Sequence, residues 1–187
     1  MTSALVIGCA SCVWEDAEKA MKLFKPDMIV AVNHIGIDWP DRVDHWATCH
    51  VDLFPAWMEQ RAAKGYEPAG QLWTNNTKIG QLPPELKGLG IKGVEYWDGS
   101  SGALGALAAI EAGADRVVLA GVPLTNGPHY YEGDHFTWDA TYQRMWNYNY
   151  LKFDDKVRSV SGWTRELLGQ PIKSWFKNAV RPDPEEV

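Results

Sequence analysis

The sequence predicts a three-layer α/β domain with a mainly parallel sheet and helices on both faces. Short, nearly continuous apolar runs typical of buried strands alternate along the chain with segments whose apolar residues recur at helical spacing. The chain of 187 residues is long enough for one sizeable core. We therefore expect one domain over 1–180 and a short, flexible acidic tail over 181–187.

The N-terminal third begins with a strand–helix–strand unit. Residues 4–9 form an apolar run closed by glycine, as a buried parallel strand does, and 27–33 form a second such run. Between them, apolar residues recur at helical spacing, so we expect a helix with Ser11 as its cap and Pro26 marking its end. The crossover between two such strands is almost always right-handed.

The next segment predicts a short strand at 44–50 and an amphipathic helix at 53–65, which Gly65 ends. Residues 66–93 are rich in Gly, Pro and Asn and show no apolar periodicity. We therefore expect a long excursion over the surface, and loops of this length are often functional.

Residues 95–124 predict a strand, a Gly-Ser-Ser-Gly turn, a helix of small residues and another strand. A polar and aromatic loop follows, then a helix from a Thr137 cap to about Tyr150, and a short helix between Ser161 and Gly169. In a Rossmann-like sheet, ligands bind beyond the carboxyl ends of the strands. This rule gathers four loops onto one rim, namely 8–13, 33–40, 98–102 and 122–136.

Two of these loops suit an anion, because each lies where a helix follows a strand. The turn at 98–102 offers backbone N–H groups and two hydroxyls to a phosphate or carboxylate, although its glycines could equally serve close helix–sheet packing. The loop at 8–12 also lies between a strand and a helix, so it is equally suited to an anion. Its Cys-x-x-Cys spacing suggests a thioredoxin-like redox pair, but the motif lies in a different topology and no cis-proline partner is evident. A zinc ribbon would need a second cysteine pair.

Residues 129–135 contain two histidines and two tyrosines, which are His129, His135, Tyr130 and Tyr131. Histidine can move a proton near neutral pH, and tyrosine hydroxyls can hold a departing phosphate. The alternative is a solvated loop whose aromatic rings pack on the domain. Elsewhere, strand alternation sends the histidines and the cysteine of 44–52 to opposite faces, so we predict no metal site there.

The composition of the chain limits which binding partners and which cellular compartment we expect. A net charge of −6 and a pI near 5.3 argue against duplex nucleic acid and against an anionic membrane. No signal-peptide pattern and no spanning apolar run is present, and three cysteines fit reduced thiols, so we expect a cytoplasmic protein. Most of the ten tryptophans should pack inside, but helices at 138–150 and 171–179 are candidate faces for a homodimer.

Four short motifs together resemble a known fold. They are "GCAS" after the first strand, "VAVN" ending the second, the "SSG" turn with its helix, and "AGADRVVLAGVPL" before a tyrosine-bearing loop. Over roughly residues 4–135 the chain resembles the bacterial sialyltransferase-like fold, that is, glycosyltransferase family 42 and the wider group of DUF115 and pterin-diphosphokinase-like proteins. Small phage-encoded proteins of vague annotation show the same pattern.

The resemblance implies roles for particular residues. The implied nucleotide-binding residues are Gly8, Ser11, Asn33, Ser100, Ser101 and Gly102. Tyr130 and Tyr131 would stabilise the leaving phosphate. The family's general base is a histidine downstream of the tyrosines, and no histidine follows His135 here, so His135 would take that role. The chain also departs from the family at Ala10, where a second glycine is usual, and at Pro123, where an acidic residue is common.

We therefore expect a protein that binds a nucleotide or nucleotide-sugar, with glycosyltransferase-like group transfer by inversion as its reaction. The ligand would be a substrate rather than a tightly bound cofactor, and no metal would be needed. One alternative is a nucleotide- or pterin-dependent transferase or hydrolase, which would require Mg²⁺. The other is a catalytically inactive phage or host interaction protein on the same fold.

Overall fold

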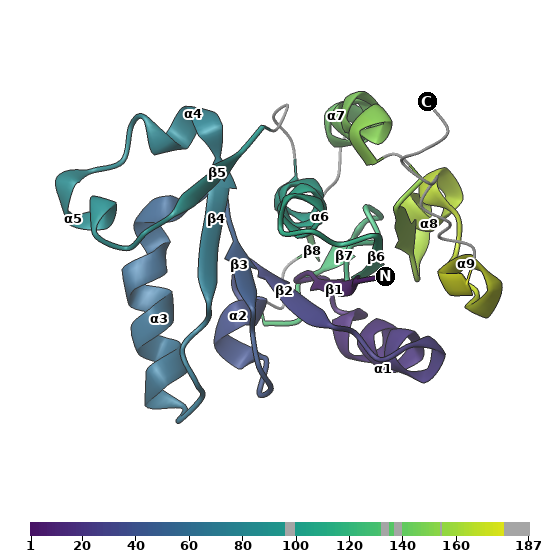
Figure 1. Cartoon of the computed structure of the whole chain (residues 1–187), viewed down its shortest axis with the longest axis horizontal. Coiled ribbons are helices and arrows are strands. Elements are labelled where there is room, and N and C mark those ends of the chain that lie inside the picture. Colours follow the sequence, from purple (N-terminus) through teal and green to yellow (C-terminus); the bar gives the residue numbers. More distant parts are fainter. Residues whose placement is uncertain (96–99, 132–134, 137–139, 154, 178–187) are drawn as a thin grey trace, which may run out of the picture.

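Seven strands of the described chain form one sheet in which every neighbouring pair is parallel (Figure 1). The spatial order is β5-β4-β3-β2-β1-β6-β9. The strands are β1 (Ser3–Ile7), β2 (Met28–Val32), β3 (His45–Ala47), β4 (Gln71–Asn75), β5 (Lys92–Val94), β6 (Arg116–Ala120) and β9 (Val157–Ser159). A separate antiparallel pair consists of β7 (Gly127–Pro128) and β8 (His135–Phe136).

The computed structural model describes residues 1–95, 100–131, 135–136, 140–153 and 155–177. For 135–136 and 140–141 it describes the backbone alone. The predicted acidic tail at 181–187 and the predicted Thr137 cap lie outside these residues.

Helices cover both faces of the sheet, as the sequence predicts (Figure 1). One face carries α6 (Ser101–Glu111), α7 (Ala140–Phe153) and α8 (Gly162–Leu168), whose side chains share one core. The other carries α1 (Val13–Leu23), α2 (Ile35–Asp38), the 3₁₀ turn η1 (Val51–Leu53) and α3 (Phe54–Ala63). The short helix α9 (Lys173–Lys177) joins the second core, since Phe176 stacks on Phe24 with ring centroids 4.7 Å apart.

The central strands are apolar because helices exclude water from both of their sides. All five residues of β1 and all five of β2 are buried. The predicted α/β class with a parallel sheet is confirmed. The third strand and its helix are also confirmed, with β3 shorter than predicted and α3 ending before Gly65, which has a φ of 76°.

Two sequence predictions about secondary structure are wrong, and one strand of the sheet was not predicted. Residues 66–93 are not an irregular excursion, because β4 lies inside the sheet between β3 and β5, with α4 (Asn76–Ile79) and α5 (Pro84–Lys87) after it. The sequence pattern does not predict β9, which lies at the other edge of the sheet. Finally, Ser11 does not cap α1, because Cys12 occupies the N-cap position without a side-chain cap. The strand predicted at the start of 95–124 falls almost wholly on residues 96–99, which lie outside the described part, and β5 ends just before it at Val94.

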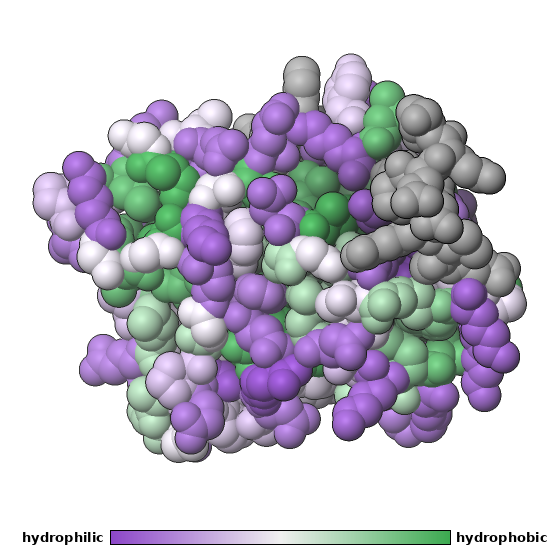
Figure 2. Space-filling model, in the orientation of Figure 1, coloured by the Kyte–Doolittle hydropathy of each residue, from purple (hydrophilic) through white to green (hydrophobic). Residues whose placement is uncertain are grey.

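The strand order reverses beside β1. From β1 the chain runs outward through β2, β3, β4 and β5, and it then returns through α6 to place β6 on the other side of β1. Such a switch point opens a crevice at the carboxyl ends of the two central strands, where ligands of α/β sheets bind. The surface in Figure 2 is mostly polar, and apolar residues show in several separate patches, one of which lies over α4 and α5.

Candidate functional site

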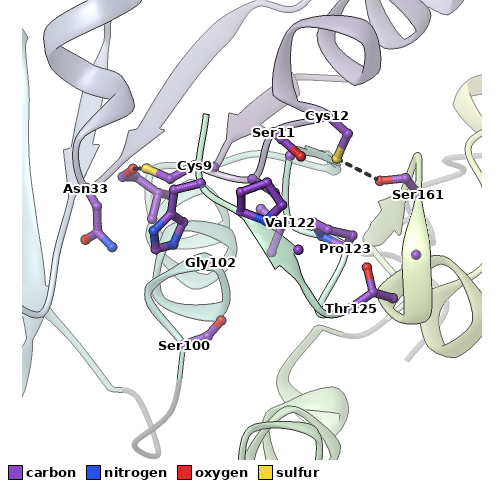
Figure 3. A pocket seen from close by; sticks show the side chains of 18 of the residues that line it. Cys9, Ser11, Cys12, Asn33, Ser100, Gly102, Val122, Pro123, Thr125 and Ser161 are labelled. Carbon is purple, nitrogen blue, oxygen red and sulfur yellow. Dashed lines mark hydrogen bonds between the residues drawn. The ribbon is translucent and has the colours of Figure 1, made fainter. Parts of the chain in front are cut away.

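A cavity of about 310 Å³ lies at the carboxyl ends of the central strands (Figure 3). Its walls come from segments that follow four different strands and from the start of α6. The lining residues fall in 8–12, 32–33, 100–102, 121–123, 125–129 and 161–162. All six residues that the family resemblance implies as nucleotide-binding are among them. The topology therefore brings these side chains to one place, whatever their role.

Asn33 lies at one end of the cavity, directly after β2, in a left-handed backbone conformation with φ 56°. Its carbonyl oxygen accepts a hydrogen bond from Trp46 Nε1 at 2.7 Å. Its Oδ1 accepts one from the buried hydroxyl of Thr48 at 2.8 Å. Because Thr48 occupies the oxygen, the NH₂ of the amide is the end presented to the cavity, and this end is a donor.

The N-terminus of α6 faces the same cavity without a side-chain cap. Ser100 is at the N-cap position, but its hydroxyl accepts a 2.8 Å hydrogen bond from Trp146 Nε1 instead of capping the helix. Within the described part of the chain, the backbone N–H groups of Ser101 and Gly102 have no hydrogen-bond partner. Two orphan donors at the positive end of an 11-residue helix are suited to an anion.

The glycines of this turn have a packing reason of their own. A Cβ at Gly102 would lie 2.5 Å from Val122 Cγ1, and one at Gly105 would lie 2.5 Å from Val32 Cγ2. Close approach of α6 to the sheet therefore explains both glycines without any ligand. It does not explain Ser101 or the uncapped helix end, so the case for an anion depends on these.

Two backbone N–H groups of the first loop are already used within the protein. The N–H of Ala10 donates to the carbonyl of Gly121 at 3.1 Å, and that of Ser11 donates to the carbonyl of Pro128 at 3.0 Å. These bonds tie the loop to the segment that follows β6. What the loop offers to the cavity is side chains, including the exposed Ser11 and the partly buried Cys9 and Cys12.

A buried carboxylate holds the far wall of the cavity together. Asp16, 1% exposed in the first turn of α1, accepts hydrogen bonds from the hydroxyl of Ser161, from the thiol of Cys12 at 3.3 Å and from the N–H of Gly121 at 3.1 Å. Burial, followed by the charge of Asp16, raises the pKa of Cys12 to about 11. The sequence predicts Ser161 only as the start of a short helix, and not as a residue of the site that it lines.

The loop after β6 divides its aromatic residues between the cavity and the neighbouring helix. His129 lines the cavity, and its backbone forms a bridge to Ala10. Tyr130 and Tyr131 are not among the described lining residues. The hydroxyl of Tyr130 donates to the carboxylate of Asp38 and lies 3.0 Å from Nδ1 of His34. The ring of Tyr131 stacks on that of His34 with centroids 4.0 Å apart and on that of His129 at 5.3 Å.

Asp38 is the charged residue at the contact between the loop after β6 and α2. Burial alone would raise its pKa, but the hydrogen bonds from Lys64 and Tyr130 and the charges of Lys64 and His34 outweigh burial and lower it. Burial and the bond to Asp38 raise the pKa of Tyr130. The loop is thereby fastened to α2. His135 belongs to β8, which pairs with β7, and its side chain is outside the described part.

Among the described residues, no group of three or more His, Cys, Asp or Glu side chains is arranged to hold a metal ion. In 44–52, Nδ1 of His45 accepts a hydrogen bond from Trp73 Nε1 at 3.2 Å. No helix in the described part of the chain has the length and apolar character needed to span a membrane.

The chain matches no protein-family model and no curated protein sequence. Its structure is similar to a solved structure of the sialyltransferase CstII from Campylobacter jejuni in complex with a substrate analogue, cytidine-5'-monophosphate. The TM-score is 0.63 with 10% sequence identity, over 99% of this chain and 96% of that chain. The chain therefore has a sialyltransferase-like fold, as the four motifs predict.

Proposed function

We propose that the cavity binds a nucleotide or nucleotide-sugar and that the protein catalyses glycosyltransferase-like group transfer from it. One observation carries this proposal. The orphan N–H groups at the start of α6 and the oriented amide of Asn33 face one cavity at the switch point of the sheet. The likeness to a sialyltransferase solved with cytidine-5'-monophosphate supports it, because that neighbour has the same fold over nearly its whole length.

The cavity has two chemically different ends, and we assign them accordingly. Asn33 lies at one end, and Thr125 and Ser161 lie at the other, with the start of α6 between them (Figure 3). The amide NH₂ suits the carbonyl and ring-nitrogen acceptors of a base. The helix N-terminus suits a phosphate. The group to be transferred would then lie toward Thr125 and Ser161.

The proposed step is a direct displacement with inversion. An acceptor hydroxyl oxygen forms a bond to the anomeric carbon of the donor while the bond from that carbon to the phosphate oxygen breaks. The bonding pair stays on the nucleotide phosphate, and the acceptor proton passes to a histidine. The helix N-terminus stabilises the charge that develops on the phosphate.

His135 is the proposed base, with Tyr130 and Tyr131 assisting the leaving phosphate. Tyr130 would have to exchange its bond to Asp38 for one to the phosphate. His129 is the matched comparison, since it lines the cavity on the same loop. If His135 is the base, His135→Ala abolishes turnover with little loss of nucleotide binding, and His129→Ala retains turnover. If His129→Ala abolishes turnover and His135→Ala retains it, His129 is the base that accepts the proton.

A thermal-shift screen of the purified chain against nucleotides and nucleotide-sugars, with and without Mg²⁺, tests the proposal. We expect a saturable rise in Tm with at least one nucleotide, which Ser101→Pro leaves smaller because proline removes one orphan N–H at a helix position that tolerates it. No rise with any nucleotide would contradict the proposal and would favour a binding protein without this chemistry. A rise that needs Mg²⁺ would favour the metal-dependent transferase or hydrolase.

A further inference from the structure

The end of the cavity assigned to the transferred group has a buried carboxylate behind its wall. Ser161 and Cys12 line this end, with Oγ and Sγ 3.7 Å apart (Figure 3). Both side chains donate to Asp16, which is 1% exposed and also accepts a backbone N–H. These three donors are neutral, and Lys19 on the same helix pairs with Glu15 instead. Within the described part of the chain, no cation therefore pairs with the negative charge behind this wall.

The hydroxyl of Ser161 can only accept a hydrogen bond from a ligand, because its proton points to Asp16. The thiol proton of Cys12 is used in the same way. Burial, and after it the charge of Asp16, raises the pKa of Cys12 to about 11, and both effects would also disfavour a ligand carboxylate at this wall. A sugar hydroxyl can donate to Ser161, whereas a carboxylate has no proton to give.

Lysine and arginine are absent from every stretch of sequence that supplies the described lining of this cavity. The stretches are 1–18, 26–41, 93–115, 117–143 and 159–164. Thr125 and Asn126, the other polar side chains near Ser161, are neutral. Arg165 lines an adjoining cavity together with Glu166, and not this one. A carboxylate at this end would therefore exchange water for neutral partners beside a buried anion, which costs free energy.

We propose that the transferred group is a hydroxyl-bearing sugar without an acidic function, which donates one of its hydroxyl groups to Ser161. The inference rests on the proposed function and narrows its class of substrate. It divides the cavity by charge. The orphan N–H groups at the start of α6 bind the phosphate, and the end at Ser161 disfavours a further anion.

The test compares donors that differ only in whether a carboxylate is present. The probes are UDP-glucose with UDP-glucuronate, GDP-mannose with GDP-mannuronate, and CMP-N-acetylneuraminate with its methyl ester. Calorimetric titration at pH 8 gives the ratio of the two Kd values within each pair. The proteins are the full-length wild type, Ser161→Ala, Asp16→Asn and Arg165→Gln, with Ser174→Ala as the control at an exposed serine of α9. A ratio of affinities does not change when part of a destabilised variant is unfolded.

We expect the wild type to bind the neutral member of at least one pair about fivefold or more tighter than the acidic member. Asp16→Asn should bring the two within about twofold of each other, because the acidic member is no longer repelled. Ser161→Ala should weaken the neutral member alone, by about threefold to tenfold. Arg165→Gln and Ser174→Ala should keep the ratio of the wild type.

Three results would overturn the inference while the proposed function stands. The first is an acidic member that binds as tightly as its neutral partner, or more tightly and only while Arg165 is present. The second is a neutral preference that neither Ser161→Ala nor Asp16→Asn changes. The third is a chain that binds nucleotides but no member of any pair, because the end at Ser161 is then no sugar site. If no nucleotide binds at all, the proposed function and the inference both fall.

Discussion

The hydroxyl of Thr48 donates a 2.8 Å hydrogen bond to Oδ1 of Asn33, and this contact orients the amide at one end of the cavity. The two residues follow neighbouring strands, β2 and β3, which the sheet holds in register. Thr48 is fully buried, and its hydroxyl also accepts the backbone N–H of His50 at 3.0 Å. The amide is therefore fixed before any ligand arrives, so binding costs it little conformational entropy.

Replacing Thr48 by valine should weaken nucleotide binding because the amide of Asn33 is then free to rotate. We expect a loss of about threefold to tenfold in affinity and a loss of stability of about 1–2 kcal/mol from the unpaired N–H of His50. Thr48→Ser, which keeps the hydroxyl, should bind nearly as the wild type does. Calorimetric titration with nucleotide measures the affinity of the two variants. Equal affinity for the valine and serine variants would show that the hydrogen bond from Thr48 to Asn33 does not matter for binding.

Removing the charge of Asp16 should destabilise the protein far more than removing that of its neighbour Glu15. Asp16→Asn keeps the shape of the side chain but weakens three bonds that join α1, the end of β6 and Ser161, so we expect a loss of about 1–3 kcal/mol. Glu15 is an exposed partner of Lys19, and Glu15→Gln should cost under about 0.5 kcal/mol. Urea denaturation of both variants gives the comparison, and equal losses would contradict the role given to Asp16.

The thiol of Cys12 should react slowly at neutral pH and faster as the pH rises toward about 11, because its pKa is raised to that value and the thiolate is the nucleophile. Bound nucleotide should protect Cys9 and Cys12, which line the cavity, and leave Cys49 unprotected. Alkylation with iodoacetamide followed by peptide mass spectrometry resolves the three sites. Protection of Cys49 alone would place the ligand elsewhere.

Tyr130 and Asp38 should behave as a coupled pair in a double-mutant cycle. Tyr130→Phe and Asp38→Asn should each destabilise the protein, and together less than the sum, with a coupling of about 1 kcal/mol or more. The pKa of Asp38 is lowered from 3.8, so its contribution to stability is fully present above that pH and is lost as the pH falls through the lowered value.

Denaturation at pH 7 and at low pH measures the coupling between these two side chains. A difference in stability between wild type and Asp38→Asn that does not shrink in acid would contradict this account of Asp38. If Tyr130→Phe leaves stability unchanged but lowers turnover, the hydroxyl acts on the leaving phosphate rather than as an anchor for the loop.

The positions of the nucleotide-binding candidates follow from the sequence because they depend only on strand order and direction. Gly8, Asn33 and the serines at 100–101 each follow a strand or begin a helix, and a parallel sheet brings such positions to one edge. The buried strands β1 and β2 can also be predicted from the sequence, since both of their faces are apolar.

Other parts of the site depend on contacts that a linear pattern does not contain. Strand β4 contains only two apolar residues, Leu72 and Trp73, and β9 has only three residues. Gly, Pro and polar residues flank both strands, so their apolar residues gave no periodic signal. Ser161 enters the site only because β9 pairs with β6 and Asp16 receives its hydroxyl. The direction of Tyr130 depends on Asp38, which is 92 residues away in the chain.

Calorimetric titration of cytidine-5'-monophosphate into the wild type, Asn33→Gly and Asn33→Ala tests the central claim most directly. Glycine tolerates the φ of 56° at this position, so Asn33→Gly removes the amide without backbone strain, whereas alanine adds a strain of about 1 kcal/mol. The account predicts saturable binding to the wild type and a loss of roughly tenfold or more in both variants. Stability falls in both, because each leaves the buried hydroxyl of Thr48 without its acceptor, and it falls further in the alanine variant because of the strain. Binding that is equally tight in the wild type and Asn33→Gly would contradict it.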